Sequence, residues 1–151
     1  MPTHGEKREM PYSAEQMFAL IADISSYPEF LPWCSAARIR SRRETENGEV
    51  VDADLVISFK LFRERFGSRV TLRPEMGEID VAYLDGPFRY LNNHWKFRPL
   101  TEASCEVDFF VDFEFRSRPL QALIGLVFNE AMQRIVRAFE ARAADLYGNK
   151  S

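Results

Sequence analysis

The sequence has few of the residue types that catalyse reactions or bind metals. Its 151 residues include two cysteines, Cys34 and Cys105, and two histidines, His4 and His94. Two cysteines alone cannot make a disulfide framework or a metal site, so we interpret both as buried thiols. The sequence contains neither a glycine-rich phosphate-binding loop nor a cluster of cysteine and histidine with zinc spacing. We therefore expect no metal, no cofactor and no enzymatic activity.

The sequence also lacks an excess of positive charge and long hydrophobic runs. Its net charge is −3 and its isoelectric point is about 5.5, which argues against binding to DNA. No hydrophobic run approaches the roughly 20 residues that a membrane span needs. Residues 1–10 are polar and lack the apolar segment of a signal peptide. We expect a cytoplasmic protein, with any membrane contact transient and peripheral, at the surface of the inner membrane.

Hydrophobic residues are plentiful, and phenylalanine is unusually common among them. They make up 46% of the chain, which includes 13 phenylalanines, while charged residues make up 28%. A chain of this length fits one domain with a sizeable core. Because we find no repeat and no domain boundary, residues 1–151 are predicted to form a single domain.

The most regular pattern lies between Cys105 and Phe115, where hydrophobic and acidic residues alternate. This period of two predicts a strand, and after Pro119 the period changes to 3.6, which predicts a helix about 40 Å long. The hydrophobic stripe of the helix contains Leu120, Leu123, Ile124, Val127, Phe128, Ala131, Ile135, Ala138, Phe139 and Leu146. A curved sheet packed against such a helix can enclose a cavity.

Before the sheet, the sequence predicts one strand and two short helices. Thr3–Met10 is the first strand, and Ser13 with Gln16 makes a capping box for a helix from Ala14 to about Ile24. The segment Ser25–Pro32 follows as a second short helix or turn.

Six further strands follow, and their short connections favour antiparallel pairing. Asn47-Gly48 is a strong hairpin signal, and Asp85-Gly86-Pro87 interrupts the pattern between two strands. We predict an α+β fold with about seven strands in a curved antiparallel sheet. The inward positions of the middle strands are Ala53, Leu55, Ile57, Phe59 and Leu61; Phe66, Ser68, Val70 and Leu72; Ile79, Val81 and Tyr83; and Leu91, Asn93, Trp95 and Phe97.

Several segments of this chain resemble those of a known family. The order of elements resembles the START-like helix-grip fold. The local motifs resemble its coenzyme Q-binding branch, which includes the ribosome-association toxins and belongs to the polyketide cyclase/dehydrase superfamily. The matching segments are Tyr27–Cys34, Gly86–Phe88 with Leu91, Trp95–Phe97, Val111–Phe115, and the terminal helix with Met132, Ala138 and Phe139.

The resemblance implies a hydrophobic cavity between the sheet and the terminal helix, able to hold ubiquinone or a similar isoprenoid lipid. Proteins of this branch are thought to deliver or chaperone ubiquinone for respiratory electron transport without modifying it. The toxin branch is described instead as binding the large ribosomal subunit. The resemblance leaves both functions open, and a cyclase or aromatase is a third alternative that would need an inward acid or base.

The inward aromatic residues can be cavity wall or simply core. Asn93 and Ser68 are polar residues on otherwise apolar strand faces, and a quinone head group offers acceptors for such donors. Asn93 can equally bond to neighbouring backbone. The ligand-binding residues that we predict are Tyr27, Phe30, Trp33, Phe59, Val70, Leu91, Asn93, Trp95, Phe109, Val111, Phe113, Val127, Phe128 and Met132.

Arginines gather on one predicted strand face, at Arg38, Arg40, Arg42 and Arg43. Such a run is usually a solvated face, but it could meet anionic lipid head groups or rRNA phosphates. The acidic positions of the last strand, Glu106, Asp108, Asp112 and Glu114, are predicted to lie on the same outer surface and to weaken a basic patch. This weakening argues modestly against the ribosome alternative.

Overall fold

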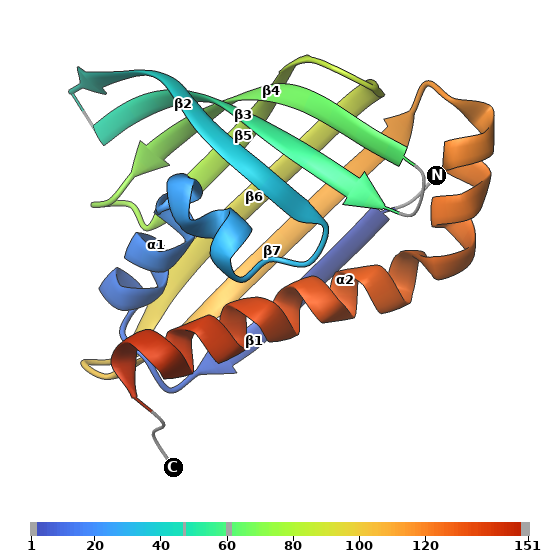
Figure 1. Cartoon of the computed structure of the whole chain (residues 1–151). Helices are drawn as coiled ribbons and strands as arrows, with labels where there is room; N and C mark the ends of the chain where they lie inside the picture. The colour runs from blue at the N-terminus through green and yellow to red at the C-terminus, as the bar shows by residue number, and fades with distance from the viewer. Residues whose placement is uncertain (1–2, 47, 60–61, 149–151) are drawn as a thin grey trace.

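Seven antiparallel strands form one sheet that bends around a long C-terminal helix (Figure 1). The computed structural model describes residues 3–46, 48–59 and 62–148. The elements in chain order are β1 (Thr3–Met10), α1 (Ala14–Ala22), the 3-10 helix η1 (Ile24–Glu29), β2 (Cys34–Thr45), β3 (Gly48–Phe59), β4 (Phe62–Arg73), β5 (Glu78–Asp85), β6 (Phe88–Thr101), β7 (Ser104–Phe115) and α2 (Arg118–Tyr147).

The strand order in the sheet is β1-β7-β6-β5-β4-β3-β2. From β2 to β7 each strand pairs with the next strand in sequence, which confirms the predicted meander. β1 is the exception, because it pairs with β7, from Thr3 opposite Asp112 to Met10 opposite Cys105. The predicted α+β helix-grip architecture is therefore confirmed.

The two short helices cover one end of the sheet. The capping box predicted for α1 is present: Ser13 Oγ accepts from the Gln16 backbone N–H at 3.1 Å, and Gln16 Oε1 accepts from the Ser13 N–H at 3.0 Å. α1 ends two residues earlier than predicted because Asp23 leaves the helical conformation, with ψ at 70°. The predicted second short helix or turn, Ser25–Pro32, is the 3-10 helix η1 followed by a turn.

The long helix α2 packs one stripe against the concave face of the sheet. Its N-cap is Ser117, whose Oγ accepts from the Leu120 backbone N–H at 3.2 Å. The prediction for Leu146 was wrong, since its side chain is 51% exposed. At this end of α2 the inward contact is made by Tyr147, whose hydroxyl donates to the Gln16 carbonyl at 2.9 Å. In the part of the chain that the structure describes, no helix is long and apolar enough to cross a membrane.

Of the remaining predictions, two concern residues outside the described part of the chain and one concerns the burial of the cysteines. Asn47 of the predicted hairpin signal and Leu61 of the predicted inward face lie outside the described residues. Cys105 is fully buried as predicted, whereas Cys34 is half-buried. Burial raises the pKa of the Cys105 thiol to about 11, and it also raises the pKa of Cys34.

Candidate ligand-binding site

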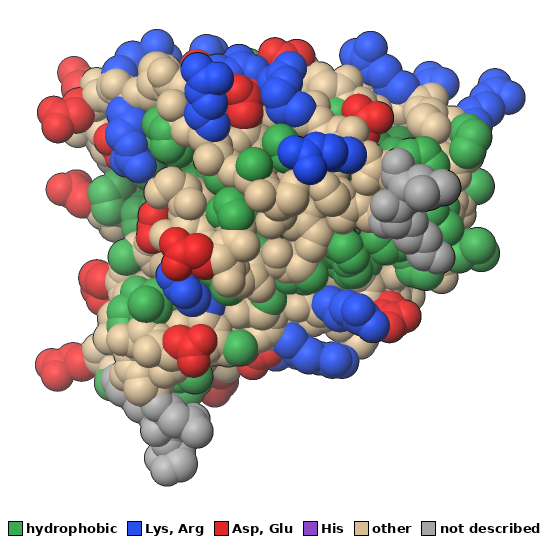
Figure 2. Space-filling view, viewed as in Figure 1, with side chains coloured by type: hydrophobic (Ala, Val, Ile, Leu, Met, Phe, Trp, Pro, Cys, Tyr) green, Lys and Arg blue, Asp and Glu red, His purple; other side chains and the backbone are tan. Residues whose placement is uncertain are grey.

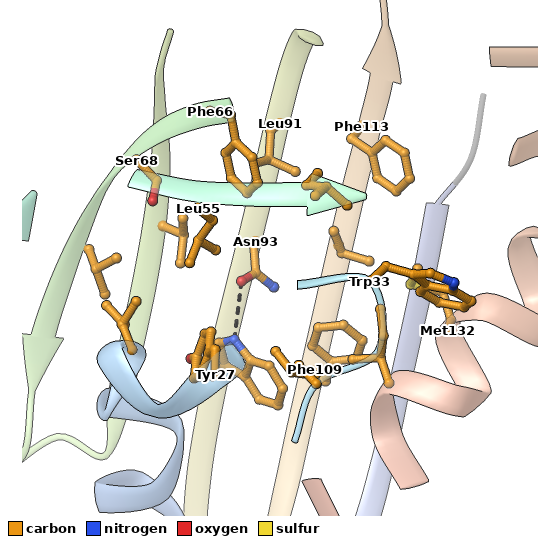
Figure 3. Close-up of a pocket in the computed structure, with 18 of the residues that line it drawn as sticks. Tyr27, Trp33, Leu55, Phe66, Ser68, Leu91, Asn93, Phe109, Phe113 and Met132 are labelled. Carbon is orange, nitrogen blue, oxygen red and sulfur yellow. Dashed lines mark hydrogen bonds between the residues drawn. The ribbon is translucent and has the colours of Figure 1, made fainter. Parts of the chain in front are cut away.

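A cavity of about 260 Å³ lies between the concave face of the sheet and α2 (Figure 3). Alternate residues of β3 to β7 form its floor, because side chains on a strand point to opposite faces. The ends of α1 and η1, the turn after η1, and α2 form the rest of the wall. The lining residues are Ile21, Ile24, Tyr27, Leu31, Trp33, Leu55, Ile57, Phe66, Ser68, Val70, Ile79, Val81, Phe88, Leu91, Asn93, Trp95, Phe109, Val111, Phe113, Phe115, Ile124, Ala131, Met132, Ile135 and Phe139.

The wall of this cavity carries no charged side chain among the described residues. Its polar groups are few: the hydroxyls of Tyr27 and Ser68, the amide of Asn93, and the indole N–H groups of Trp33 and Trp95. An apolar wall with a few placed polar groups is typical of a small-molecule binding site. Any occupant of this space must therefore be largely apolar and uncharged.

Asn93 is held in one orientation by two neighbours. Its Nδ2 donates to the Phe110 carbonyl at 2.9 Å, and its Oδ1 accepts from Trp95 Nε1 at 3.1 Å. The bond to neighbouring backbone that we weighed as an alternative is therefore present. A primary amide has two N–H donors and two acceptor lone pairs. One donor and one lone pair of Asn93 remain for another partner.

Among the described residues of the sheet, Ser68 is the buried polar one, with 3% of its surface exposed. Its hydroxyl points into the cavity from β4 (Figure 3). Among the described residues, none forms a hydrogen bond with this hydroxyl. The oxygen therefore faces the empty space of the cavity rather than a protein partner.

Tyr27 is the one lining residue with an ionisable hydroxyl. That hydroxyl donates to the Ile21 carbonyl, which joins η1 to the end of α1. Burial raises the pKa of Tyr27 well above its usual value, and the nearby Cys34 and Asp23 raise it further. The Tyr27 hydroxyl is therefore neutral at physiological pH, and its proton is already donated to the Ile21 carbonyl.

Trp33 lies at the edge of the cavity in a left-handed backbone conformation, with φ at 65°. For a residue other than glycine this conformation costs roughly 1–2 kcal/mol. The Trp33 carbonyl accepts from the Ser58 N–H at 2.8 Å, and its ring packs edge-on against Phe59 at 5.6 Å. These contacts hold the indole between the sheet and α2.

Ten of the fourteen residues that we predicted as ligand-binding lie together in this wall. They are Tyr27, Trp33, Val70, Leu91, Asn93, Trp95, Phe109, Val111, Phe113 and Met132. Their contact with a ligand remains a prediction, since the geometry places them around the space without testing what occupies it.

The structure does not bring the other four predicted residues to the wall. Phe30 packs on Tyr27 and on Phe139 from outside, and the Arg142 guanidinium lies 5.1 Å from the centre of its ring. Phe59 packs edge-on against the Trp33 ring at the edge of the cavity.

Val127 and Phe128 miss the wall because each residue of a helix is turned by about 100° from the last. Val127 lines a shallow depression on the outside of α2, beside Leu126, which is 85% exposed. Phe128 is buried behind the wall, between the rings of Phe113 and His4.

Sequence analysis missed several lining residues that come from the helices. Ile21, Ile24, Ile124, Ala131 and Ile135 lie on hydrophobic helix stripes, which give the same signal for a packed core and for a cavity wall. On the strands, Leu55 and Ile57 stood at inward positions, so alternation was a signal that could have found them. Ser68 was noted as a polar inward residue but was not among the fourteen predicted ligand-binding residues.

The outer face of β2 to β5 carries arginines paired with acids of the same strands. Arg40 bonds to Asp54 through two nitrogens, Arg65 bridges Asp54 and Asp85, and Arg69 bonds to Asp52 at 2.9 and 3.0 Å. The hydrogen bond from Arg40 holds the pKa of Asp54 below its usual range, with help from Arg65.

The partners of this arginine face differ from those we expected. The acidic residues of β7 lie on the outer face of the sheet, as predicted, but β6, β5, β4 and β3 separate them from the arginines of β2. Glu114 pairs with Arg89 and Glu106 pairs with Arg98 instead. Arg38 and Arg63 form no ion pair with any described residue, so part of the basic face stays unneutralised.

Comparison with known proteins assigns this architecture to a family. Residues 10–140 match the family described as polyketide cyclase/dehydrase and lipid transport. The chain belongs to this family. The resemblance inferred from the motifs of the sequence is confirmed.

Curated relatives in this family carry two kinds of name. The ribosome association toxin RatA of Rickettsia prowazekii is 41% identical over 140 residues, which cover 91% of this chain and 92% of that protein. The mitochondrial coenzyme Q-binding protein COQ10 homolog B of Xenopus laevis is 30% identical over 151 residues, which cover 97% of this chain and 60% of that protein.

Solved structures share the fold over almost the whole family domain. A START superfamily protein from Mycobacterium smegmatis has a TM-score of 0.79 at 19% identity and covers 95% of this chain and 98% of its own. The Zhui aromatase/cyclase from Streptomyces sp. R1128 has a TM-score of 0.78 at 15% identity, covering 94% of this chain and 93% of its own. At such low identity these likenesses show the fold alone.

Proposed function

We propose that this protein binds ubiquinone or a similar neutral isoprenoid lipid in its cavity and serves as a carrier or chaperone for respiratory electron transport. The observation that carries the proposal is the composition of the wall, which is almost wholly apolar and has no charged side chain among the described residues. The name of the COQ10 relative supports the choice of a quinone.

The energy of binding would come mainly from burial of the lipid. Each 100 Å² of apolar ligand surface removed from water contributes about 2.5 kcal/mol. Part of this gain offsets the loss of ligand freedom, so micromolar affinity needs roughly 500 Å² or more of buried apolar surface.

The size of the cavity limits how much of the lipid it can hold. Its 260 Å³ lie just below the range of about 300–1,000 Å³ that is common for small-molecule sites. A quinone ring with the first part of its tail fits this space better than a long polyprenyl chain. The rest of the tail would then leave the cavity or displace α2.

The exposed hydrophobic surface offers a route by which a lipid could enter. Figure 2 shows hydrophobic side chains gathered between α2 and the ends of β3 and β4, on the side where Trp33 closes the cavity. Contact of this region with the surface of a membrane would let the lipid move without crossing water. We place the protein in the cytoplasm, at the membrane surface only while it loads or unloads.

Holding a ligand fits this wall better than transforming it. Catalysis by proton transfer needs a group with a pKa near the working pH. The one ionisable lining group, the Tyr27 hydroxyl, is neutral and already donates to Ile21. No acid or base of the described wall is available to activate a substrate.

The direct test is to purify the protein from a respiring host and extract it with organic solvent. We expect quinone in the extract, in an amount that approaches one per protein molecule. A control purification of the Ala131→Phe variant, whose new ring would fill the cavity, should yield much less. An extract without quinone from the wild-type protein would contradict the proposal.

Ribosome association is a second candidate function, favoured by the RatA relative and by the basic face. Arg38 and Arg63, which form no ion pair with a described residue, could meet rRNA phosphates. The test is co-sedimentation with large ribosomal subunits at rising salt. Association that the double variant Arg38→Ala, Arg63→Ala weakens, and that Ala131→Phe leaves unchanged, would support this function over lipid carriage.

A further inference from the structure

We propose that Ser68 and Asn93 form a head-group site inside the cavity, selective for an uncharged ring that carries acceptor oxygens on two opposite sides. This inference rests on the proposed function, because it says which end of a neutral lipid lies inward and what chemistry that end has. Figure 3 shows the two side chains on β4 and β6, away from Trp33 and Met132 at the edge of the cavity.

Ser68 is a polar residue at a place where packing alone would favour an apolar one. Its neighbours on the inner face of β4, Phe66 and Val70, are both apolar and line the same cavity. None of the described side-chain nitrogen or oxygen atoms is both fully buried and without a hydrogen-bond partner, so the Ser68 oxygen keeps open contact with the cavity. Polar groups inside proteins are nearly always hydrogen-bonded, to protein, water or a ligand. The hydroxyl of Ser68 has no such bond within the described chain, and it faces the space that a ligand would fill.

Asn93 supplies the second polar group, and its orientation is fixed before any ligand arrives. Trp95 and the Phe110 carbonyl each occupy one side of the amide. The remaining N–H is therefore a donor with a set direction rather than a freely rotating group. Such preorganisation reduces the entropy lost when a ligand binds.

The spacing of the two groups sets the shape of the head group. Asn93 pairs with Val81 of β5, and Val81 pairs with Val70, two residues from Ser68 on β4. One strand separates β4 from β6, which puts these two strands about 10 Å apart, and the offset of two residues along β4 adds about 7 Å at right angles. The backbones of Ser68 and Asn93 therefore lie about 12 Å apart. Two hydrogen bonds of about 3 Å each leave room between them for a flat ring. Carbonyl or ether oxygens on opposite sides of that ring would reach both donors.

The same wall rejects charged head groups. A carboxylate or phosphate would lie among apolar side chains with no arginine, lysine or histidine in the described lining to pair with it. Burying an unpaired charge is strongly unfavourable. The site should therefore discriminate against fatty acids and prenyl phosphates, even when their tails match that of a quinone.

The test compares three ligands with the same short isoprenoid tail: a ubiquinone ring, a benzene ring without oxygens, and a carboxylic acid. Wild-type protein should bind the quinone most tightly and the acid least. Ser68→Ala should weaken quinone binding about three- to tenfold, as expected for the loss of one hydrogen bond. It should leave binding of the oxygen-free ring unchanged within about twofold. Ser35→Ala, at an exposed serine of β2, is the matched control and should change neither.

A second measurement reports on the bonds themselves and does not depend on a variant at Asn93. The infrared carbonyl bands of the bound quinone should lie below those of the free quinone, and Ser68→Ala should shift one band back. The side-chain amide resonance of Asn93 should move on addition of the quinone and not on addition of the oxygen-free ring.

The outcomes separate this inference from the proposed function. Wild-type protein that binds the quinone and the oxygen-free ring equally, or Ser68→Ala that binds the quinone as tightly as wild type, would overturn the head-group site while leaving a lipid carrier. Wild-type protein that binds none of the neutral ligands would overturn the proposed function itself.

Discussion

Trp95 and Asn93, two residues apart on the inner face of β6, are joined by a hydrogen bond of 3.1 Å from the indole Nε1 to the amide Oδ1. The Trp95 ring also packs against Phe109 at 4.4 Å and Phe139 at 5.5 Å. The Trp95 side chain thus packs against both the sheet and the terminal helix, and it also fixes the orientation of the Asn93 amide in the cavity.

We predict that Trp95→Phe destabilises the protein by about 2–3 kcal/mol. The substitution removes the donor to Asn93 and leaves a smaller ring among the aromatic side chains. Urea unfolding measures the change in the free energy of unfolding. The control is Trp33→Phe at the cavity edge, for which we expect a change within about 1 kcal/mol. Equal losses for the two variants would show that the bond to Asn93 contributes little.

We predict that Ala131→Phe abolishes binding of a short-chain quinone. Ala131 is buried on the face of α2 that lines the cavity, so a phenyl ring there must enter the space that the ligand needs. Ala122→Phe, on the exposed side of the same helix, is the matched control and should bind like wild type. Quenching of tryptophan fluorescence by the quinone measures both. Undiminished quenching in Ala131→Phe would place the ligand elsewhere.

We predict that stability falls as the pH rises from about 9 to about 11, through the thiol of Cys105. Burial raises the pKa of this thiol from 9.0 to about 11, so between these values the folded protein keeps a proton that the unfolded chain loses. The stabilisation is complete below pH 9 and amounts to about 2–3 kcal/mol. Chemical unfolding at several pH values measures the slope. Cys105→Ala should show a shallower slope above pH 9, whatever its stability at neutral pH.

We predict that Asp54→Asn makes the protein less sensitive to acid. The hydrogen bond from Arg40, and then that from Arg65, lowers the pKa of the Asp54 carboxyl. Its contribution is therefore present above the pKa of the unfolded chain and is lost as the pH falls through the lower folded value. Melting temperatures between pH 6 and 3 should fall less in Asp54→Asn than in wild type. Parallel curves would show that this carboxyl is not coupled to folding.

Alternation was enough to predict most of the sheet. Residues 105–115 show the reason, because every second side chain from Cys105 to Phe115 is buried and the sheet has one concave face. The helical period was less reliable on α2, where it placed Val127 and Leu146 on the stripe that faces the sheet. A helix stripe indicates which side is apolar, but the partner element decides which residues of that side are covered.

The candidate site was predictable only in part, since a packed core and an apolar cavity have the same sequence pattern. Phe128 and Met132 stand on one stripe of α2, yet Phe128 packs behind Phe113 while Met132 faces the cavity. The polar residues were more informative. Ser68 and Asn93 stood out because a polar side chain at an inward position needs a hydrogen-bond partner.

The sequence by itself determined the order of elements, the inward face of each strand and the largely apolar residue types on those faces, because these follow from local periodicity and residue type. Tertiary structure alone decided that a space of about 260 Å³ remains open, that Asn93 is held by Trp95 and Phe110, and that the Ser68 hydroxyl faces this space without a hydrogen bond to any described residue. These features depend on how far a curved sheet stands from the helix it encloses. That distance is set by contacts between residues far apart in the chain.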